Sequence, residues 1–291
     1  MSAVFKGMRK HLTAVIPCIL LLAALLGSVG VQAQFSRKVD ERVVQADTLM
    51  ARDDFAGALA LYTKVIESSR LATPQEAHVL YKRAYCYYSL ERFSDALTDV
   101  NRYIEKTDDL QAVLLRAYVF QGLGRTDDQL NDINRLAQNN PDNLDLLRWR
   151  ASVLMDAEKY KDARRDLQKI MMIDRSPEIA GYLGLTYYYD NDPDSALIIF
   201  DKVLASHPGH AQTYVYAASL ALEEESFPLA LSYIDKGLQR DPANNTLLFY
   251  KGIALVESEK TDEGCRCLAR AFAAGTDDAG DYLKQYCYGG E

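Results

Sequence analysis

The sequence predicts an all-α protein in which pairs of short antiparallel helices repeat along the chain. Three observations support this fold class. Small residues recur about every 34 positions, a second small residue follows each of them after twelve positions, and an apolar residue follows after sixteen. Helix pairs of this length bury a continuous core only when they stack on one another, so the pattern is typical of a solenoid.

Two columns of small residues set the register of the repeats. The first column contains Ala46, Ala84, Ala117, Ala151, Gly184, Ala218 and Gly252. The second contains Ala58, Ala96, Gln129, Ala163, Ala196, Ala230 and Gly264. Ala and Gly make up only 51 of the 291 residues, so chance does not explain two such columns. In an antiparallel pair these positions face each other, and Gln129 therefore predicts looser packing in the third repeat.

The apolar column marks the buried face of each second helix. Its members are Tyr62, Val100, Ile133, Leu167, Phe200, Ile234 and Leu268. In the fifth repeat Asp192 is placed to cap the second helix, and Pro193 fits the first turn of that helix. After the seventh repeat, residues 278–286 have the spacing of a first helix with no second helix behind it. We expect this segment to cap the exposed end of the array.

Taken together, these columns resemble the tetratricopeptide repeat family. The resemblance covers nearly all of the chain after residue 33 and implies a right-handed superhelical solenoid with a C-terminal capping helix. It places seven repeats over residues 39–276, followed by the capping helix and tail over residues 277–291. It also implies a non-catalytic role, in which the array binds other proteins.

Residues 1–33 have the pattern of a secretory signal peptide. A basic start is followed by the apolar run 12–26 and by small residues that end at Ala33, where we expect cleavage. The mature protein would then be exported, to the periplasm or beyond the cell. The alternative is an uncleaved membrane anchor, because residues 12–33 are uncharged and long enough to cross a bilayer.

Charge and motifs exclude several functions. The formal net charge is −8 for the whole chain and −11 without residues 1–33, which argues against a general nucleic-acid binder. The sequence contains no motif of a nucleophile, a phosphate-binding loop or a zinc protease. His207 and His210 lie in a turn between two repeats, and we interpret them as turn residues and not as metal ligands. We therefore predict no enzyme activity and no cofactor or metal.

The cysteines near the C-terminus suggest one disulfide. Cys265 and Cys267 lie two apart on one predicted helix and cannot bond to each other without breaking it. Cys287, in the last helix, could reach either of them, and Cys267 with Cys287 is the candidate pair. Reduced cysteines that pack as small apolar residues are the alternative.

The chain contains 19 tyrosines, more than the core positions of the repeats require. In the family that the chain resembles, the first helix of each pair lines a concave groove, and ligands touch positions three before, one after and four after the first small residue. These positions yield the partner-binding candidates Tyr81, Tyr85, Tyr88, Tyr118, Arg148, Tyr188 and Phe249. Aromatic rings suit recognition of a peptide or protein.

The predicted function is an exported scaffold that binds a protein or peptide partner in an aromatic groove. A structural subunit or assembly factor of an envelope or secretion complex is the alternative, and the rings could serve only to pack one repeat on the next. The Lys and Asn residues with which some family members grip an acidic peptide terminus are absent. The oligomeric state stays open.

Overall fold

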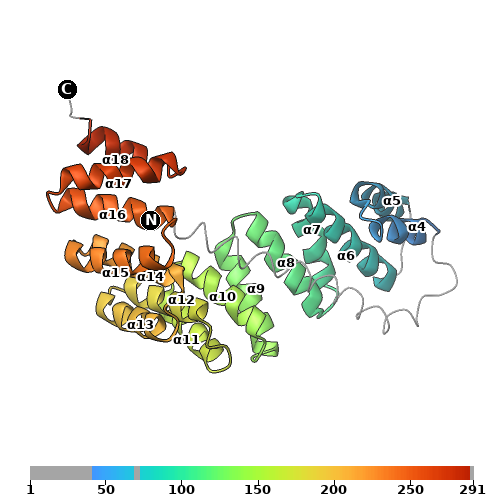
Figure 1. Ribbon diagram of the computed structural model, residues 1–291. Coiled ribbons are helices and arrows are strands. Elements are labelled where there is room, and N and C mark those ends of the chain that lie inside the picture. The colour runs from blue at the N-terminus through green and yellow to red at the C-terminus, as the bar shows by residue number, and fades with distance from the viewer. Residues whose placement is uncertain (1–40, 69–72, 289–291) are drawn as a thin grey trace. The chain divides into compact units, whose positions relative to one another are not determined.

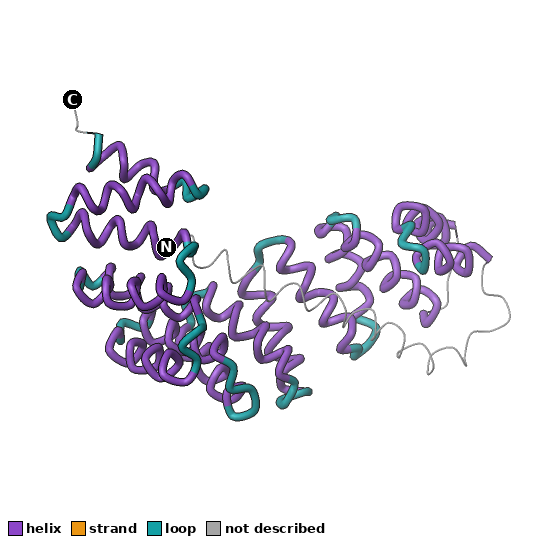
Figure 2. The backbone as a smooth tube through the Cα atoms, viewed as in Figure 1, coloured by secondary structure: helices purple, strands orange, loops and turns teal. Residues whose placement is uncertain are grey.

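The computed structural model describes residues 41–68 and 73–288, and this part of the chain forms 15 α-helices and no β-strand (Figure 1, Figure 2). The helices are α4 (Glu41–Met50), α5 (Phe55–Ser68), α6 (Thr73–Ser89), α7 (Phe93–Ile104), α8 (Leu110–Gly122), α9 (Thr126–Asn139), α10 (Leu144–Asp156), α11 (Tyr160–Met171), α12 (Pro177–Tyr189), α13 (Pro193–Ser206), α14 (Ala211–Glu223), α15 (Phe227–Arg240), α16 (Asn245–Glu257), α17 (Thr261–Ala273) and α18 (Asp278–Tyr286). The predicted all-α solenoid of helix pairs with a capping helix is confirmed. The expected signal peptide, residues 1–33, lies outside the described residues.

The chain divides into two compact units, residues 1–153 and 154–291. The described part of the N-terminal unit contains α4 to α9 and most of α10, and that of the C-terminal unit contains α11 to α18. Within each unit, consecutive helices run back along each other, and short turns join the two helices of a pair (Figure 2). None of the described helices is long and apolar enough to cross a membrane.

Both small columns lie where the two helices of a pair approach most closely. A Cβ atom added at Gly264 would lie 2.8 Å from the backbone oxygen of Gly252, a contact that real side chains do not make. Gln129, the exception in the second column, is only 4% exposed, and its amide nitrogen has no hydrogen-bond partner. The third pair therefore contains a buried polar group at the position that holds a small residue in the other repeats.

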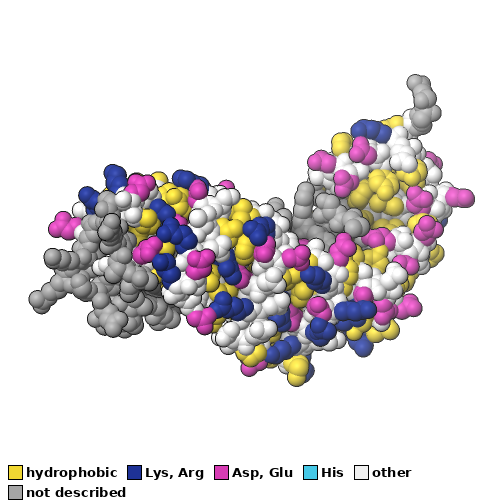
Figure 3. All heavy atoms as spheres, turned by 180° about the vertical axis from the view of Figure 1, so that it is seen from behind, with side chains coloured by type: hydrophobic (Ala, Val, Ile, Leu, Met, Phe, Trp, Pro, Cys, Tyr) yellow, Lys and Arg dark blue, Asp and Glu magenta, His cyan; other side chains and the backbone are white. Residues whose placement is uncertain are grey.

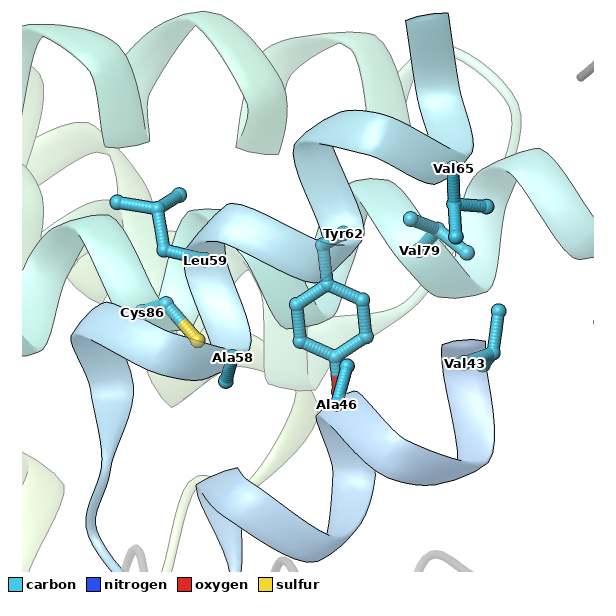
Figure 4. Packing of buried hydrophobic residues seen from close by; sticks show 8 residues of the cluster. All are labelled: Val43, Ala46, Ala58, Leu59, Tyr62, Val65, Val79 and Cys86. Carbon is cyan, nitrogen blue, oxygen red and sulfur yellow. The ribbon is translucent and has the colours of Figure 1, made fainter. Parts of the chain in front are cut away.

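The apolar column forms the core between the helices, and all seven of its members are buried. In the first pair the ring of Tyr62 projects from α5 toward Ala46 of α4, with Val43 and Val79 beside it (Figure 4). The Tyr62 hydroxyl donates to the Asp47 carboxylate at the edge of this cluster. The ring is thus buried while its one polar atom is satisfied.

The turn inside every repeat contains a residue with a left-handed backbone, seven positions after the first small residue. Six of these residues are not glycine: Asp53, Glu91, Glu158, Asn191, Glu225 and Glu259. The seventh is Gly124, with a φ of 68°. Helices often end in this conformation because it lets backbone N–H groups bond to the last free carbonyl oxygens. Arg92 shows this bond, since its N–H donates to the carbonyl of Tyr87 at 2.8 Å.

Buried ion pairs cross between the two helices of a pair in the N-terminal unit. They join Arg83 to Asp99, at 2.6 Å, and Arg116 to Asp132, at 2.7 Å. Both bonds are doubled, because a second guanidinium nitrogen reaches the other carboxylate oxygen. Asp99 is only 2% exposed, so loss of its arginine would leave a charge in the core. In the fifth repeat the same two positions hold Leu183 and Ile199.

The capping helix α18 packs on α17 and α16 and buries Ala279 and Leu283 against them. A disulfide joins Cys265 of α17 to Cys287, with a Cα–Cα distance of 5.7 Å. The candidate pair of Cys267 with Cys287 is therefore wrong, and Cys267 is a free thiol. Two positions along a helix are separated by about 200° around its axis, so only one of the two cysteines of α17 can face α18.

Candidate partner-binding surfaces

Helix α6 presents three of the candidate tyrosines on one side. Tyr81, Tyr85 and Tyr88 are spaced by four and three residues, which places them on one helical face. All three are partly buried. The Tyr85 and Tyr88 rings lie 6.5 Å apart, and Tyr85 also lies 6.0 Å from Phe55 of the preceding pair. The structure therefore joins Tyr85 and Tyr88 with Phe55 into one aromatic run.

The aromatic run continues into α8, where its character changes. Tyr88 lies 6.2 Å from Tyr118, and Tyr118 stacks on Trp149 of α10 with ring centroids 4.6 Å apart. Tyr118 is 9% exposed because Trp149 covers it. Tyr118 was predicted to contact a partner, but most of its surface packs one repeat on the next. We call Phe55, Tyr85, Tyr88, Tyr118 and Trp149 the aromatic run of the N-terminal unit.

Tyr81 of α6 belongs to a separate pair of rings. Its ring lies 5.2 Å from that of Tyr103, whose hydroxyl donates to the Asp109 carboxylate at 2.8 Å. Burial and this bond raise the pKa of Tyr103 to about 12. Burial also raises the pKa of Tyr81. Both phenols are neutral near pH 7. Tyr103 already donates its hydrogen to Asp109, so Tyr81 is the one that can donate to a partner.

Arg148 does not join the aromatic run. It lies on α10, and its guanidinium is 3.1 Å from the carboxylate of Asp145 in the same helix. Both side chains are partly open to solvent, and an exposed pair at this spacing adds little to stability. Arg148 thus remains accessible as a surface cation within an ion pair.

In the C-terminal unit, Tyr188 lies in a second group of rings. Its hydroxyl donates to the carboxylate of Glu223 on α14, and its ring lies 5.2 Å from that of Tyr189. Tyr189 in turn stacks on Tyr160 of α11 at 5.5 Å. Burial, with Glu223, Tyr160 and Tyr250 nearby, raises the pKa of Tyr189 to about 12. We call these four tyrosines and Glu223 the tyrosine–carboxylate face.

Phe249, the last candidate, is a core residue. It is 8% exposed, and its ring meets the edge of Tyr282 of α18 at 5.4 Å. Leu283 and Ala279 of α18 bury the same cluster. The capping helix thus covers the position that would line a groove in an uncapped repeat.

Sequence reasoning missed one aromatic column, two residues before the first small residue. Its members are Trp149, Tyr182, Tyr216 and Tyr250. These rings lie against the preceding repeat: Trp149 stacks on Tyr118, and a Cβ added at Gly181 would lie 3.1 Å from the Tyr216 ring. Four aromatic residues at one register in consecutive repeats were a signal that could have identified the column.

The described residues offer no site for a metal, because they contain no group of three or more His, Cys, Asp or Glu side chains that could hold one. The Nδ1 atom of His210 lies 2.7 Å from the Thr213 hydroxyl in the following helical turn, and its Nε2 atom lies 3.3 Å from the Glu178 carboxylate on α12. The aromatic run and the tyrosine–carboxylate face expose aromatic rings, phenol hydroxyls and carboxylates. Such groups can bind another molecule through van der Waals contact, hydrogen bonds and charge.

Comparisons with known proteins identify the repeats. A family model described as tetratricopeptide repeat matches residues 43–110, 114–175 and 183–245. The heat shock protein STI1 of Saccharomyces cerevisiae is 42% identical over 71 residues, which are 24% of this chain and 11% of that protein. The chain thus spans about a tenth of that relative.

Two solved structures have a similar fold. One is the C-terminal part of a TPR repeat-containing protein from Cytophaga hutchinsonii, with 18% identity, a TM-score of 0.62, and coverage of 83% of this chain and 99% of that chain. The other is a tetratricopeptide repeat protein from Parabacteroides merdae, with 18% identity, a TM-score of 0.55, and coverage of 84% and 97%. At this identity the likeness shows the fold alone. The edges of the seven repeats over residues 39–276 stay a prediction, but the match of the family model over more than half of the chain shows that this protein belongs to the tetratricopeptide repeat family.

Proposed function

We propose that the protein is an exported, non-catalytic scaffold that binds a peptide or protein partner through aromatic surfaces on the first helices of its repeats. Membership of the tetratricopeptide repeat family supports the general role of a protein–protein interaction scaffold. A solenoid of short repeats serves this role because it presents a long surface made of similar units.

The observation that carries the proposal is the aromatic run of the N-terminal unit. Tyr85 and Tyr88 are only partly buried, although each ring contacts a neighbouring ring. Rings held by their neighbours lose little side-chain freedom when a partner binds, and their neutral hydroxyls can bond to a partner backbone. Trp149 and Tyr118, which are buried beneath, fix the spacing of this surface.

Export is supported by two independent features. The first is the signal-like pattern of residues 1–33. The second is the disulfide between Cys265 and Cys287, because such bonds persist in oxidising compartments outside the cytoplasm. N-terminal sequencing of the protein from its own cell should find Gln34 as the first residue. A first residue upstream of the apolar run would refute cleavage.

The scaffold role is tested by capture of partners with the full chain as bait. Proteins retained by the wild type should be lost from the double variant Tyr85→Leu and Tyr88→Leu, which keeps apolar packing but removes both rings. The control variant Tyr288→Leu removes a tyrosine that is 71% exposed at the far end of the chain, and it should retain the same proteins. If the double variant folds and still captures the wild-type set, the aromatic run is not the binding surface.

A further inference from the structure

The aromatic run contains hydrogen-bond donors that the chain itself does not use. Tyr118 and Trp149 are only 9% and 6% exposed, yet among the described residues neither the Tyr118 hydroxyl nor the Trp149 N–H has an acceptor. Gln129 supplies the one fully buried side-chain nitrogen or oxygen without a partner in the described ranges, so these two polar atoms reach the surface. The Tyr88 hydroxyl, on a partly buried ring, has no acceptor in the described chain either. Burial raises the pKa of Tyr88 and of Tyr118, so both keep their hydrogen near pH 7.

The same side chains offer little to a molecule that needs acceptors. The members of the aromatic run include no carboxylate and no amide. An ordinary extended peptide carries an N–H at every residue, and each N–H needs an acceptor. A proline has no N–H, and a peptide in the polyproline II conformation makes no internal hydrogen bonds, so its carbonyl oxygens are free to accept. A proline-rich segment therefore complements a surface of donors.

The spacing of the rings suits such a segment. Tyr85 lies 6.0 Å from Phe55 and 6.5 Å from Tyr88, and Tyr88 lies 6.2 Å from Tyr118. One turn of polyproline II contains three residues and is about 9 Å long, so each turn meets at least one ring. Aromatic surfaces bind these segments well, because a preformed extended conformation loses little entropy on binding.

Two features of the sequence narrow the occupant of the aromatic run. Residues 34–153 contain 16 Lys and Arg and 18 Asp and Glu, and Figure 3 shows the two signs interspersed on one side of the N-terminal helices. Charge therefore selects neither an acidic nor a basic partner here. None of the chain's 8 prolines lies within ten residues of another, so a proline-rich occupant comes from a different protein.

We propose that the aromatic run binds a proline-rich segment of the partner protein in the polyproline II conformation. This inference rests on the scaffold function proposed above and names the chemistry of its partner. Pyrrolidine rings of the segment pack on the partly exposed rings of Tyr85 and Tyr88 and exclude water from them. Carbonyl oxygens of the segment accept hydrogen bonds from the Tyr88 and Tyr118 hydroxyls and from the Trp149 N–H.

A pair of synthetic peptides tests the proposal. One fluorescent peptide repeats Pro-Pro-Ala over twelve residues. In its twin, N-methylglycine replaces every proline, which keeps the N–H absent but removes the ring and frees the backbone. Each peptide is titrated with the full chain, and binding is followed by fluorescence anisotropy. The proline peptide should bind about tenfold more tightly than its twin, since ring contact and a preformed conformation act together. Added salt should leave its affinity unchanged, because the aromatic run has no charged side chain.

Variants locate the site. Tyr88→Phe removes one hydroxyl while the ring stays, and it should weaken binding of the proline peptide by about threefold to tenfold. The matched control Tyr288→Phe removes a hydroxyl from a ring that is 71% exposed in the C-terminal unit, and it should leave the affinity unchanged. The double variant Tyr85→Leu and Tyr88→Leu should abolish measurable binding. Circular dichroism confirms that each variant is folded.

Three results would overturn the proposal. Equal binding of the proline peptide and its twin would show that pyrrolidine rings are not recognised. Equal affinity of Tyr88→Phe and the wild type would show that Tyr88 donates no hydrogen bond to the segment. Captured partners that an excess of the proline peptide does not displace would show that a segment of other chemistry occupies the aromatic run. In each case, loss of partner capture by the Tyr85 and Tyr88 double variant would still support the scaffold function, so the two proposals fail separately.

Discussion

Replacement of Gln129 by methionine should stabilise the N-terminal unit. Gln129 occupies a position that holds Ala or Gly in the other six repeats, and its buried amide nitrogen has no hydrogen-bond partner. A buried polar group without a partner costs about 1–3 kcal/mol. Methionine has nearly the same length and helix propensity, so the substitution removes the amide without opening a cavity.

The expected gain is therefore about 1–3 kcal/mol in the free energy of unfolding of this unit. Alanine at the same position should give a smaller gain, because it also loses the buried Cγ methylene group, which is worth about 0.8 kcal/mol. The measurement is urea unfolding followed by fluorescence. The chain has one tryptophan, Trp149, and it packs on Tyr118 of α8, next to the third pair. The urea concentration at the midpoint of unfolding should rise, while the slope of the unfolding free energy against urea concentration stays the same.

A matched control separates this effect from a general preference for methionine. Gln121 lies on α8, is exposed, and can receive the same substitution. Gln121→Met should change stability by less than about 0.5 kcal/mol, as surface substitutions usually do. If Gln129→Met leaves the midpoint unchanged or lowers it, the amide is satisfied in solution and the reasoning is refuted.

Three other changes test the packing. Asp99→Ile alone should lower the free energy of unfolding by about 3–5 kcal/mol, because it leaves the Arg83 guanidinium without its carboxylate. The double variant with Arg83→Leu should be as stable as the wild type or more stable in urea unfolding. Equal losses of stability in the two variants would contradict this account. Cys287→Ser should loosen α18 by up to about 3 kcal/mol, seen as faster amide exchange there, while Cys267→Ser should change nothing. Glu91→Gly should raise the thermal midpoint through a gain of about 0.5–1 kcal/mol, since glycine adopts a left-handed backbone without strain; a lower midpoint would refute that account.

The fold could be predicted because close packing of the helices restricts the size of the residues between them. Wherever two helices approach closely, as at Ala46 and Ala58, only a small side chain fits, and the core needs an apolar residue at a fixed distance. The left-handed turn residues escaped prediction because five of the seven are Asp or Glu. Here the geometry of the helix pair imposes a conformation for which these residues have no preference, so their identity carries no signal.

The candidate site was predictable only in part. The position of a residue within its repeat predicts the direction of its side chain, but it does not predict which neighbouring side chain or helix packs over it. Tyr85 and Tyr88 lie together on the surface as the spacing indicated. Tyr118 and Phe249 both occupy predicted groove positions, yet the ring of Trp149 covers Tyr118 and the capping helix covers Phe249. The choice between Cys265 and Cys267 escaped prediction for a similar reason, since it depends on how α18 is rotated against α17.

Charge explains why the two units of one family fold offer different surfaces. In the N-terminal unit, acids such as Asp99 are paired with arginines inside the helix pairs, so these charges are neutralised internally. In the fifth repeat, within the C-terminal unit, these two positions hold Leu183 and Ile199, so this helix pair uses no charge there. Its carboxylates, Glu223 among them, remain beside tyrosines at the surface. Because stability in repeat arrays spreads mainly between neighbouring repeats, this surface can change its charge without changing the packing of the N-terminal unit.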